Sequence, residues 1–383
     1  MRPLRIAMIG LRGLPATHGG IERHVEEIGS RLAERGRDVV AFCRPAYSDT
    51  TISSYRGMSL RFLPTPSTRG IEALVHSGLS TLATVGRGYD VAHFHALGPG
   101  LFTPISRGLT RAAVVQTIHG MDDQRAKWGG GAQSALRVGA WLSARVPHEV
   151  IVVSRALQEH YAELGRPATY VSNGVPPVAP VDDGELARFG LTRDGYAVFV
   201  GRLVPEKDPR LLIEAYRDVA TDLPLVIVGD SSHTDDYVAE LHRLARPDAR
   251  VRLVGYQHGP TLTSLMGGAR VMVQPSLLEG LPITLLEAAA QGVPVLASDI
   301  APHHEVVRSE GAGRRLFPVT DKAALTQALN EMLGTDPEIL HADAEVLRAD
   351  AVRRYDWDVA TDLVEQTYAR ALSGRSSRRQ SVP

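Results

Sequence analysis

Short apolar runs alternate with segments of helical spacing along almost the whole chain, and this alternation limits the fold more than any other feature. The runs are nearly continuous, which is typical of strands buried on both faces of a parallel sheet. In the first half they are Leu4–Leu11, Val39–Cys43, Leu60–Leu63, Val91–His95, Val114–His119 and Val150–Ser154. In the second half they are Val198–Val200, Leu225–Val228, Val251–Val254, Val271–Gln274 and Val295–Ala297.

A segment without periodicity, Asn173–Glu185, divides the alternation in two. It contains three prolines and two glycines, which is typical of a linker. Two successive strand and helix series predict an α/β protein with two doubly wound, Rossmann-like domains. We expect these domains to cover residues 1–175 and 176–357. They are followed by a helix at 358–373 that can return to the first domain, and by a basic, serine-rich tail at 374–383 that we expect to be disordered.

Composition excludes several classes of protein. The 383 residues are 44% hydrophobic and 22% charged, as in a soluble globular protein, and no run of about 20 apolar residues predicts a transmembrane helix. The first 13 residues resemble a strand rather than a secretory signal. A lone cysteine, Cys43, excludes internal disulfides and a thiolate cluster, so we expect a cytoplasmic protein.

Charge is divided unevenly between the two halves. Residues 1–175 contain 20 Lys and Arg against 13 Asp and Glu, a net charge of +7, whereas the remaining residues have a net charge of −8. One interpretation is an anionic partner for the first half, such as a phosphorylated lipid or the inner face of a membrane, with the arginine-bearing segment Ile71–Arg87 as a candidate contact. The other interpretation is a solvated, arginine-rich surface.

The second half contains a pattern suited to a phosphorylated, hydroxyl-bearing ligand. Arg202 and Lys207 follow a strand directly, and two cations at a strand end can neutralise a diphosphate without a metal ion. Pro282 stands where a helix begins, and free N–H groups at a helix start bind anions. Glu279 and Glu287 flank this helix start, and carboxylates accept hydrogen bonds from sugar hydroxyls. Taken singly, each of these residues is more often part of a solvated surface than of such a site.

The combination resembles glycosyltransferase family four, the retaining group 1 enzymes with the GT-B fold. The resemblance extends over nearly the whole chain and rests on motifs in a fixed order. They are the GG loop before Ile21, QTIHG, VSRA, SNGV, VGRLVPEKD, LVIVGD, VRLVGY and EGLPITLLEAAAQ. The segment APHHEV departs from the family, which often has a Gly-Gly-like turn there, so a local contact is expected to differ.

The resemblance implies roles for residues of the second domain, which would bind a nucleoside diphosphate sugar as donor substrate without any cofactor or metal. Arg202 and Lys207 match the pair that binds the donor diphosphate. Glu287 matches the carboxylate that holds the ribose, and Glu279 the one near the reacting centre of the sugar. The residues that match backbone contacts to phosphate, sugar and base are Leu281, Pro282, Ile283 and Tyr256.

The resemblance also implies roles in the first domain, which would bind the acceptor. Gly19 and Gly20 match glycines that let a helix start approach the diphosphate, and His119 matches a histidine that reaches the donor sugar. A loop after His119 looks like that of bacterial, rhamnosyltransferase-like polysaccharide enzymes, and its acceptor-side candidates are Arg125, Lys127 and Trp128; a helix-capping surface loop is the alternative. We interpret His93 and His95, which share one strand face, as packing or hydrogen-bonding residues and not as metal ligands.

The predicted function is therefore metal-independent, retaining transfer of a sugar, expected to be a hexose, to a hydroxyl of a glycan, lipid-linked or small-molecule acceptor in bacterial polysaccharide or glycoconjugate biosynthesis. Two alternatives stay open. One is a sugar-nucleotide 2-epimerase-like enzyme of the same fold, and the other is a non-catalytic partner that binds nucleotide sugars. We expect no nucleic acid partner. The base, the sugar and the acceptor are not fixed by the sequence.

Overall fold

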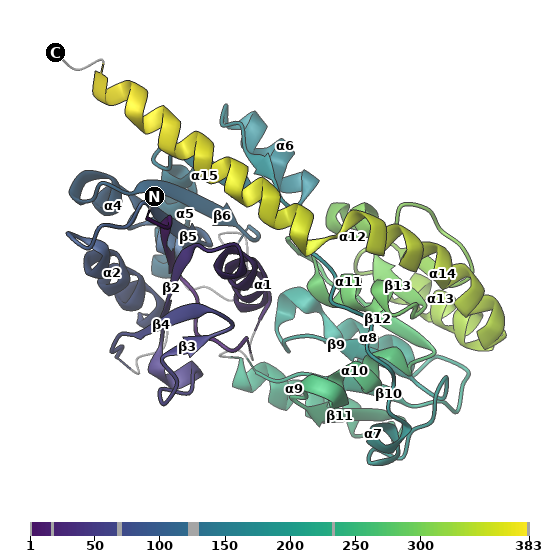
Figure 1. Ribbon diagram of the computed structural model, residues 1–383. Helices are drawn as coiled ribbons and strands as arrows, with labels where there is room; N and C mark the ends of the chain where they lie inside the picture. The colour runs from purple at the N-terminus through teal and green to yellow at the C-terminus, as the bar shows by residue number, and fades with distance from the viewer. Residues whose placement is uncertain (1, 17–18, 67–70, 122–129, 232–233, 381–383) are drawn as a thin grey trace. The chain divides into compact units, whose positions relative to one another are not determined.

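Two sheets form the frame of the protein in the computed structural model (Figure 1). The structure describes residues 2–16, 19–66, 71–121, 130–231 and 234–380. Unit 1 comprises Met1–Asn173 and Trp357–Pro383, and unit 2 comprises Gly174–Asp356. The chain therefore leaves unit 1 within two residues of the boundary drawn from sequence, and its last helix belongs to unit 1.

Unit 1 contains an eight-stranded sheet in the order β3-β4-β2-β1-β5-β6-β7-β8. All pairs of neighbours are parallel except β3 with β4, which is antiparallel. The strands are β1 (Arg5–Ile9), β2 (Asp38–Cys43), β3 (Ser54–Tyr55), β4 (Met58–Phe62), β5 (Val91–His95), β6 (Ala113–Ile118), β7 (Glu149–Val152) and β8 (Thr169–Tyr170). The two shortest strands, β3 and β8, were not predicted.

Helices cover this sheet and provide its core. Helix α1 directs Val25, Ile28 and Leu32 into the core, as its helical spacing predicts. The helices of unit 1 are α1 (Gly20–Glu34), α2 (Glu72–Thr84), α3 (Leu97–Gly100), α4 (Thr103–Leu109), α5 (Gly130–Ser143), α6 (Arg155–Glu163) and α15 (Trp357–Gln380), with a 3-10 turn, η1, at Pro45–Tyr47.

Helix α15 returns to the first sheet, where it packs against α1, β6 and β7. Its buried residues Trp357, Val364 and Tyr368 belong to the same core as Ile6 and Val115. The sequence-based end of this helix at residue 373 is wrong, because α15 continues to Gln380. Arginine and glutamine have good helix propensity and no proline interrupts the segment, so the polar composition that predicted disorder is also compatible with a helical extension.

Unit 2 contains a six-stranded, entirely parallel sheet in the order β11-β10-β9-β12-β13-β14. The strands are β9 (Ala197–Val200), β10 (Leu225–Val228), β11 (Val251–Gly255), β12 (Val271–Gln274), β13 (Val295–Ser298) and β14 (Arg314–Phe317). The helices are α7 (Asp183–Ala187), α8 (Pro209–Tyr216), α9 (Asp235–Ala245), α10 (Gly259–Gly267), α11 (Ile283–Ala290), α12 (Ala301–Val306), α13 (Lys322–Gly334) and α14 (Pro337–Arg354), with a 3-10 turn, η3, at Pro205–Lys207.

The carboxyl ends of β9 and β10 approach each other closely at two glycines. A Cβ atom on Gly229 would lie 1.9 Å from the carbonyl oxygen of Gly201, and Gly229 has a φ of +151°. Only glycine fits this conformation and this contact. The loops that leave these strand ends are therefore packed together, at the edge where ligands bind in doubly wound sheets. Among the described residues, no helix is both long and apolar enough to cross a membrane.

Candidate active site

Glu279 is the centre of a polar cluster in the loop between β12 and α11. Its side chain is only 9% exposed. Its Oε1 atom accepts hydrogen bonds from Lys207 Nζ at 2.6 Å, Ser276 Oγ at 2.7 Å and Gln274 Nε2 at 3.0 Å. Since all three donors bind Oε1, the orientation of the carboxylate is fixed and Oε2 faces none of them. The cluster thus holds the carboxylate through one oxygen, and Oε2 lies outside these three hydrogen bonds.

Lys207 reaches Glu279 because the strands before the two residues are neighbours in the sheet. Strand β9 pairs with β12, so the loops at their carboxyl ends run side by side. The Leu277 N–H donates to the Glu206 carbonyl at 2.9 Å and ties the two loops together. Asp208, with a φ of +47°, then caps α8 by accepting from the Leu211 N–H at 3.2 Å. The lysine is held between a turn and a capped helix.

The environment of Glu279 keeps it ionised. Burial by itself raises the pKa of this carboxyl, but the charges of Lys207 and His303 and the hydrogen bonds from Lys207 and Ser276 outweigh burial and lower the pKa to about 2. At neutral pH Glu279 is therefore a carboxylate that accepts hydrogen bonds. A proton-donor role for Glu279 at this pH is therefore disfavoured.

His303 is a neighbour of Glu279. It belongs to the segment APHHEV, which drew notice in the sequence only because it departs from the family pattern. It is fully buried on α12, and its Nδ1 lies 2.7 Å from the carbonyl oxygen of Ser298. Burial lowers the pKa of His303 to about 4, against the opposing charge of Glu279. Sequence reasoning also missed Gln274 and Ser276. A signal for them was present in the sequence, because two polar residues stand at the end of an otherwise apolar strand. Polar groups that are buried there need hydrogen-bond partners.

The start of α11 is open for an anion. Pro282 occupies the position before the helix and Ile283 begins it, as predicted within one residue. No side chain caps the helix, and its first backbone hydrogen bond joins the Leu286 N–H to the Pro282 carbonyl at 3.2 Å. The preceding N–H groups therefore have no partner within the helix, which is the arrangement that binds phosphate.

The other predicted residues of unit 2 lie around the same strand ends. Arg202 is half-buried in the loop after β9, and Glu287 is half-buried on α11. Leu281 is buried just before α11, and Tyr256 follows β11 with 39% of its surface exposed. Of the predicted set, the structure brings Lys207 and Glu279 into direct contact; Arg202 lies in the loop after β9, Glu287 on α11 and Tyr256 after the edge strand β11.

In unit 1 the two predicted glycines begin helix α1. Gly19 precedes the helix with a φ of +93°, Gly20 is its first residue, and no side chain caps it. Helix α1 also binds the backbone of residues that follow β1, because Glu22 accepts from the Arg12 N–H at 2.9 Å and Glu26 from the Ala16 N–H at 2.6 Å. This second helix start is also uncapped.

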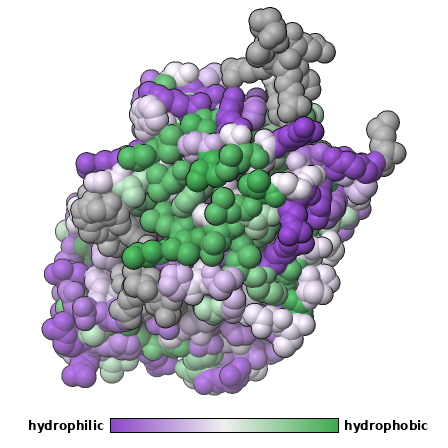
Figure 2. Space-filling view, turned by 90° about the vertical axis from the view of Figure 1, so that its left-hand side faces the viewer, coloured by the Kyte–Doolittle hydropathy of each residue, from purple (hydrophilic) through white to green (hydrophobic). Residues whose placement is uncertain are grey.

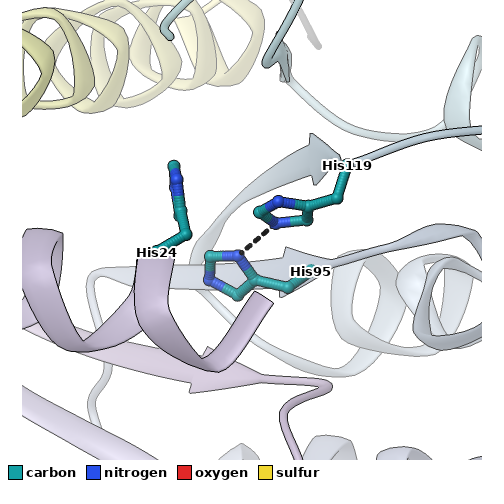
Figure 3. Close-up of side chains that lie close together, drawn as sticks. All are labelled: His24, His95 and His119. Carbon is teal, nitrogen blue, oxygen red and sulfur yellow. Dashed lines mark hydrogen bonds between the residues drawn. The ribbon is translucent and has the colours of Figure 1, made fainter. Parts of the chain in front are cut away.

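His119 lies at the end of β6 in a group of buried histidines (Figure 3). His95 Nδ1 is 3.3 Å from His119 Nε2, and the His24 ring meets the His119 ring edge-on with 4.8 Å between centroids. His24 Nδ1 is held by Asn173 Oδ1 at 2.9 Å. Histidines from the HFHA motif and from α1 thus surround His119. Sequence reasoning missed the positions of His24 and Asn173 in this group.

Burial keeps these imidazoles neutral. It lowers the pKa of His24 to about 4 and holds the pKa values of His95 and His119 well below the usual range. Neutral imidazoles are metal ligands, and one nitrogen from each of these three lies within 4.8 Å of the others, so in the part of the chain that is described they are the group able to hold a transition-metal ion. His93 instead contacts the Tyr368 hydroxyl at 2.8 Å and Thr117 Oγ1 at 2.7 Å, which confirms its predicted hydrogen-bonding role.

Three acceptor-side candidates, Arg125, Lys127 and Trp128, lie outside the described residues.

Two Rossmann-like, largely parallel sheets with polar groups at their strand ends are typical of the GT-B fold, and solved structures agree. The chain is similar to sucrose-phosphate synthase from Thermosynechococcus elongatus, with a TM-score of 0.82 and 22% identity over 97% of this chain and 100% of that one. It is also similar to Anabaena HepE solved with UDP and glucose, with a TM-score of 0.79 and 19% identity over 96% and 99%. These likenesses show the fold.

The sequence comparisons give the family. The model described as Glycosyl transferases group 1 matches residues 187–344, and the model described as Glycosyltransferase Family 4 matches residues 18–179. A phosphatidyl-myo-inositol mannosyltransferase of Mycobacterium leprae is 28% identical over 91% of this chain and 92% of its own length. The chain belongs to glycosyltransferase family four, group 1, and is a glycosyltransferase by family.

Proposed function

We propose that this glycosyltransferase moves a sugar from a nucleoside diphosphate sugar to an acceptor hydroxyl, with retention of anomeric configuration and without a metal ion. The observation that carries the proposal is the Lys207–Glu279 contact beside the uncapped start of α11. It combines a cation, an ionised carboxylate and free backbone N–H groups in one unit. The complexes of HepE with UDP and with UDP-glucose support a donor of this class.

Each group has a chemical task in the proposed reaction. The bond between the anomeric carbon and the diphosphate oxygen breaks, and Lys207, Arg202 and the α11 N–H groups stabilise the charge that develops on the leaving diphosphate. Oε2 of Glu279 accepts a hydrogen bond from a hydroxyl of the transferred sugar, while Glu287 holds the ribose. Lys207 neutralises Glu279 before the donor arrives and is shared with the diphosphate afterwards.

Retention follows from attack on the face that the leaving group vacates. The acceptor oxygen forms the new bond on that face, and its proton passes to an oxygen of the departing diphosphate. The low pKa of Glu279 supports its role as a carboxylate that orients the sugar. A covalent intermediate on Glu279 is the competing route, and trapping a glycosylated Glu279 by mass spectrometry would favour it.

Unit 1 binds the acceptor in this proposal. The uncapped start of α1 at Gly20 and the half-buried His119 are the groups of this unit that we expect to contact substrate. The phosphatidyl-myo-inositol named in the mycobacterial relative supports a lipid-linked acceptor in glycoconjugate or polysaccharide biosynthesis. We propose that the enzyme works in the cytoplasm, at the inner face of the cell membrane.

The test combines donor binding with turnover. A thermal-shift screen of nucleoside diphosphate sugars identifies the donor, because a ligand held well above its Kd raises the melting temperature. Release of nucleoside diphosphate is then measured for Lys207→Ala and Glu279→Ala, with Lys322→Ala as the matched control. Lys322 pairs with Asp218 at 2.6 Å on the surface of the same unit. We expect losses of roughly 100-fold or more for the first two variants and none for the control.

Normal turnover by both site variants would refute the assignment. Transfer that persists after chelation with EDTA supports the metal-free reaction, whereas loss of transfer restored by a transition metal directs attention to His24, His95 and His119. Product analysis with donor alone and with acceptor separates transfer from 2-epimerisation, and donor binding without any turnover would identify a non-catalytic partner.

A further inference from the structure

One face of unit 1 exposes large apolar side chains on three helices. They are Leu79 and Leu82 on α2, Ile105 and Leu109 on α4, and Val138 and Trp141 on α5. We call this the α2–α4–α5 face. Figure 2, which views the side where Figure 1 places α2 and α4, shows a broad hydrophobic area. Leu82, Leu109 and Trp141 are each more than half exposed, at 53%, 60% and 56%.

The three helices form a continuous surface. Helix α2 packs against α4 and α3, and α3 packs against α5. The packing is close, because a Cβ atom on Gly139 of α5 would lie 2.5 Å from the carbonyl oxygen of Leu97 on α3. A contiguous exposed apolar area of this kind marks an interaction site, whereas single exposed apolar residues are common.

The sequence of α2 is unusual for a helix at a water-facing surface. Among its 13 residues, Glu72 alone is charged. Surface helices of globular proteins place charged and polar residues on the side opposite the core, yet Leu79 and Leu82 occupy exposed positions three residues apart. The outward side of α2 is therefore built for a partner that accepts apolar side chains.

Arginines accompany this apolar area. Arg87 follows α2, Arg111 follows α4, and Arg137 lies on α5; all three are exposed. The acids of the same described segments are already engaged, since Glu72 lies 3.7 Å from Arg44 and Asp90 pairs with Arg2 at 2.6 Å. Segments 71–121 and 134–145 contain no further Asp or Glu. The face thus combines apolar side chains with positive charge that has few acids to offset it.

Trp141 and Arg145 form a direct contact between an apolar side chain and a positive charge on this face. The Arg145 guanidinium lies 4.6 Å from the centroid of the Trp141 ring. Both side chains are exposed, one turn apart on and just after α5. An exposed tryptophan beside a cation is typical of side chains at the headgroup level of a membrane, where the ring meets the acyl boundary and the cation meets phosphate.

We propose that the α2–α4–α5 face docks the protein on an anionic lipid bilayer. Apolar side chains from three helices enter the boundary between headgroups and acyl chains, and the surrounding arginines bind lipid phosphates. Charge complementarity favours an anionic bilayer as the partner. Its headgroups carry negative charge that complements the arginines, and its acyl interior accepts the apolar side chains. The inference rests on the membrane location given in the proposed function and names the surface that makes the contact; this surface belongs to unit 1 alone and does not depend on the donor site of unit 2.

The experiment is flotation of the full-length protein with vesicles. One set contains phosphatidylcholine with a quarter phosphatidylglycerol, and the other contains phosphatidylcholine alone. The apolar variant is Leu82→Ser with Leu109→Ser. Its matched control is Ile339→Ser with Val346→Ser, two residues of α14 that are equally exposed, at 56% and 52%. The charge variant is Arg111→Gln with Arg137→Gln, matched by Arg243→Gln with Arg246→Gln at exposed positions of unit 2.

We expect the unmodified protein to float with the anionic vesicles and to dissociate as salt is raised. The apolar and the charge variants are each expected to weaken binding on the order of tenfold or more, and both controls to bind normally. Circular dichroism checks that the variants are folded. The donor-induced thermal shift is expected to stay unchanged in every variant, so failure of docking is distinguishable from failure of the proposed function.

Three outcomes would overturn the proposal. The first is that the unmodified protein does not bind anionic vesicles. The second is that the α2–α4–α5 variants and their controls bind alike. The third is that sedimentation shows a dimer that the Leu82 and Leu109 substitutions dissociate, which would identify the face as a contact between two copies of the chain.

Discussion

Acid is expected to unfold unit 1 before most carboxylates titrate, because its buried histidines must accept protons on unfolding. His24, His76 and His93 are fully buried, and burial lowers their pKa values from 6.5 to about 4, 4 and 3. A histidine with a folded pKa below its unfolded pKa binds fewer protons when folded. The stability of unit 1 is therefore complete above pH 6.5 and falls as the pH is lowered toward 4.

The size of the effect follows from the shifts. Below the unfolded pKa, each such histidine costs slightly over 1 kcal/mol of unfolding free energy per pH unit, so the three together cost about 4 kcal/mol at pH 5.5. Buried His95 and half-buried His119, whose pKa values are also lowered, act in the same direction. Since a domain is stable by roughly 5–15 kcal/mol, this is a large fraction of the total.

Tryptophan fluorescence measures this prediction on unit 1 alone, because Trp128, Trp141 and Trp357 all belong to its two chain segments. Urea unfolding is followed at pH 7.5, 6.5 and 5.5. In His93→Gln the dependence on pH should become shallower by about one proton. The exposed His242→Gln of unit 2 is the control and should leave it unchanged. An unfolding free energy that is the same at pH 7.5 and 5.5 would refute the reasoning.

Two further predictions concern unit 2. Gly229→Ala should destabilise this unit by at least about 2 kcal/mol, since its Cβ would lie 1.9 Å from the Gly201 oxygen at a strained φ; an unchanged urea midpoint by circular dichroism would contradict this. Ser276→Ala removes one of three donors to Glu279 Oε1 and should raise the pKa of Glu279 and lower turnover roughly fivefold, by about 1 kcal/mol. Turnover at pH 7.5 measures the loss, and a rate that matches the unmodified enzyme would argue against the role of this hydrogen bond.

Much of the fold was predictable because buried parallel strands form continuous apolar runs. The run Leu225–Val228 coincides with β10, and Val271–Gln274 with β12. Strand β14, Arg314–Phe317, was missed because it carries two arginines at the edge of the sheet. Helix α14 was missed although Leu340, Ala344, Leu347 and Ala351 follow helical spacing, because half of its buried side chains are alanines with little contrast to the exposed ones.

The candidate site was predictable in its residue types but not in its contacts. Lys207 and Glu279 are 72 residues apart, and their pairing depends on β9 and β12 being neighbours in the sheet. The order of strands in a sheet cannot be derived from a single sequence. The roles of Gln274 and Ser276 depend on the same loop geometry. In unit 1, the HFHA motif indicated a shared strand face, but the packing of His24 against His119 required the position of α1.

The return of helix α15 to the first sheet has a consequence for biosynthesis. Trp357, Val364 and Tyr368 fill the core of unit 1, yet they are made by the ribosome after all of unit 2. The residues of Met1–Asn173 must therefore wait with an open apolar face while unit 2 emerges and folds. Unit 1 is thus the first unit to leave the ribosome and the last to complete its core.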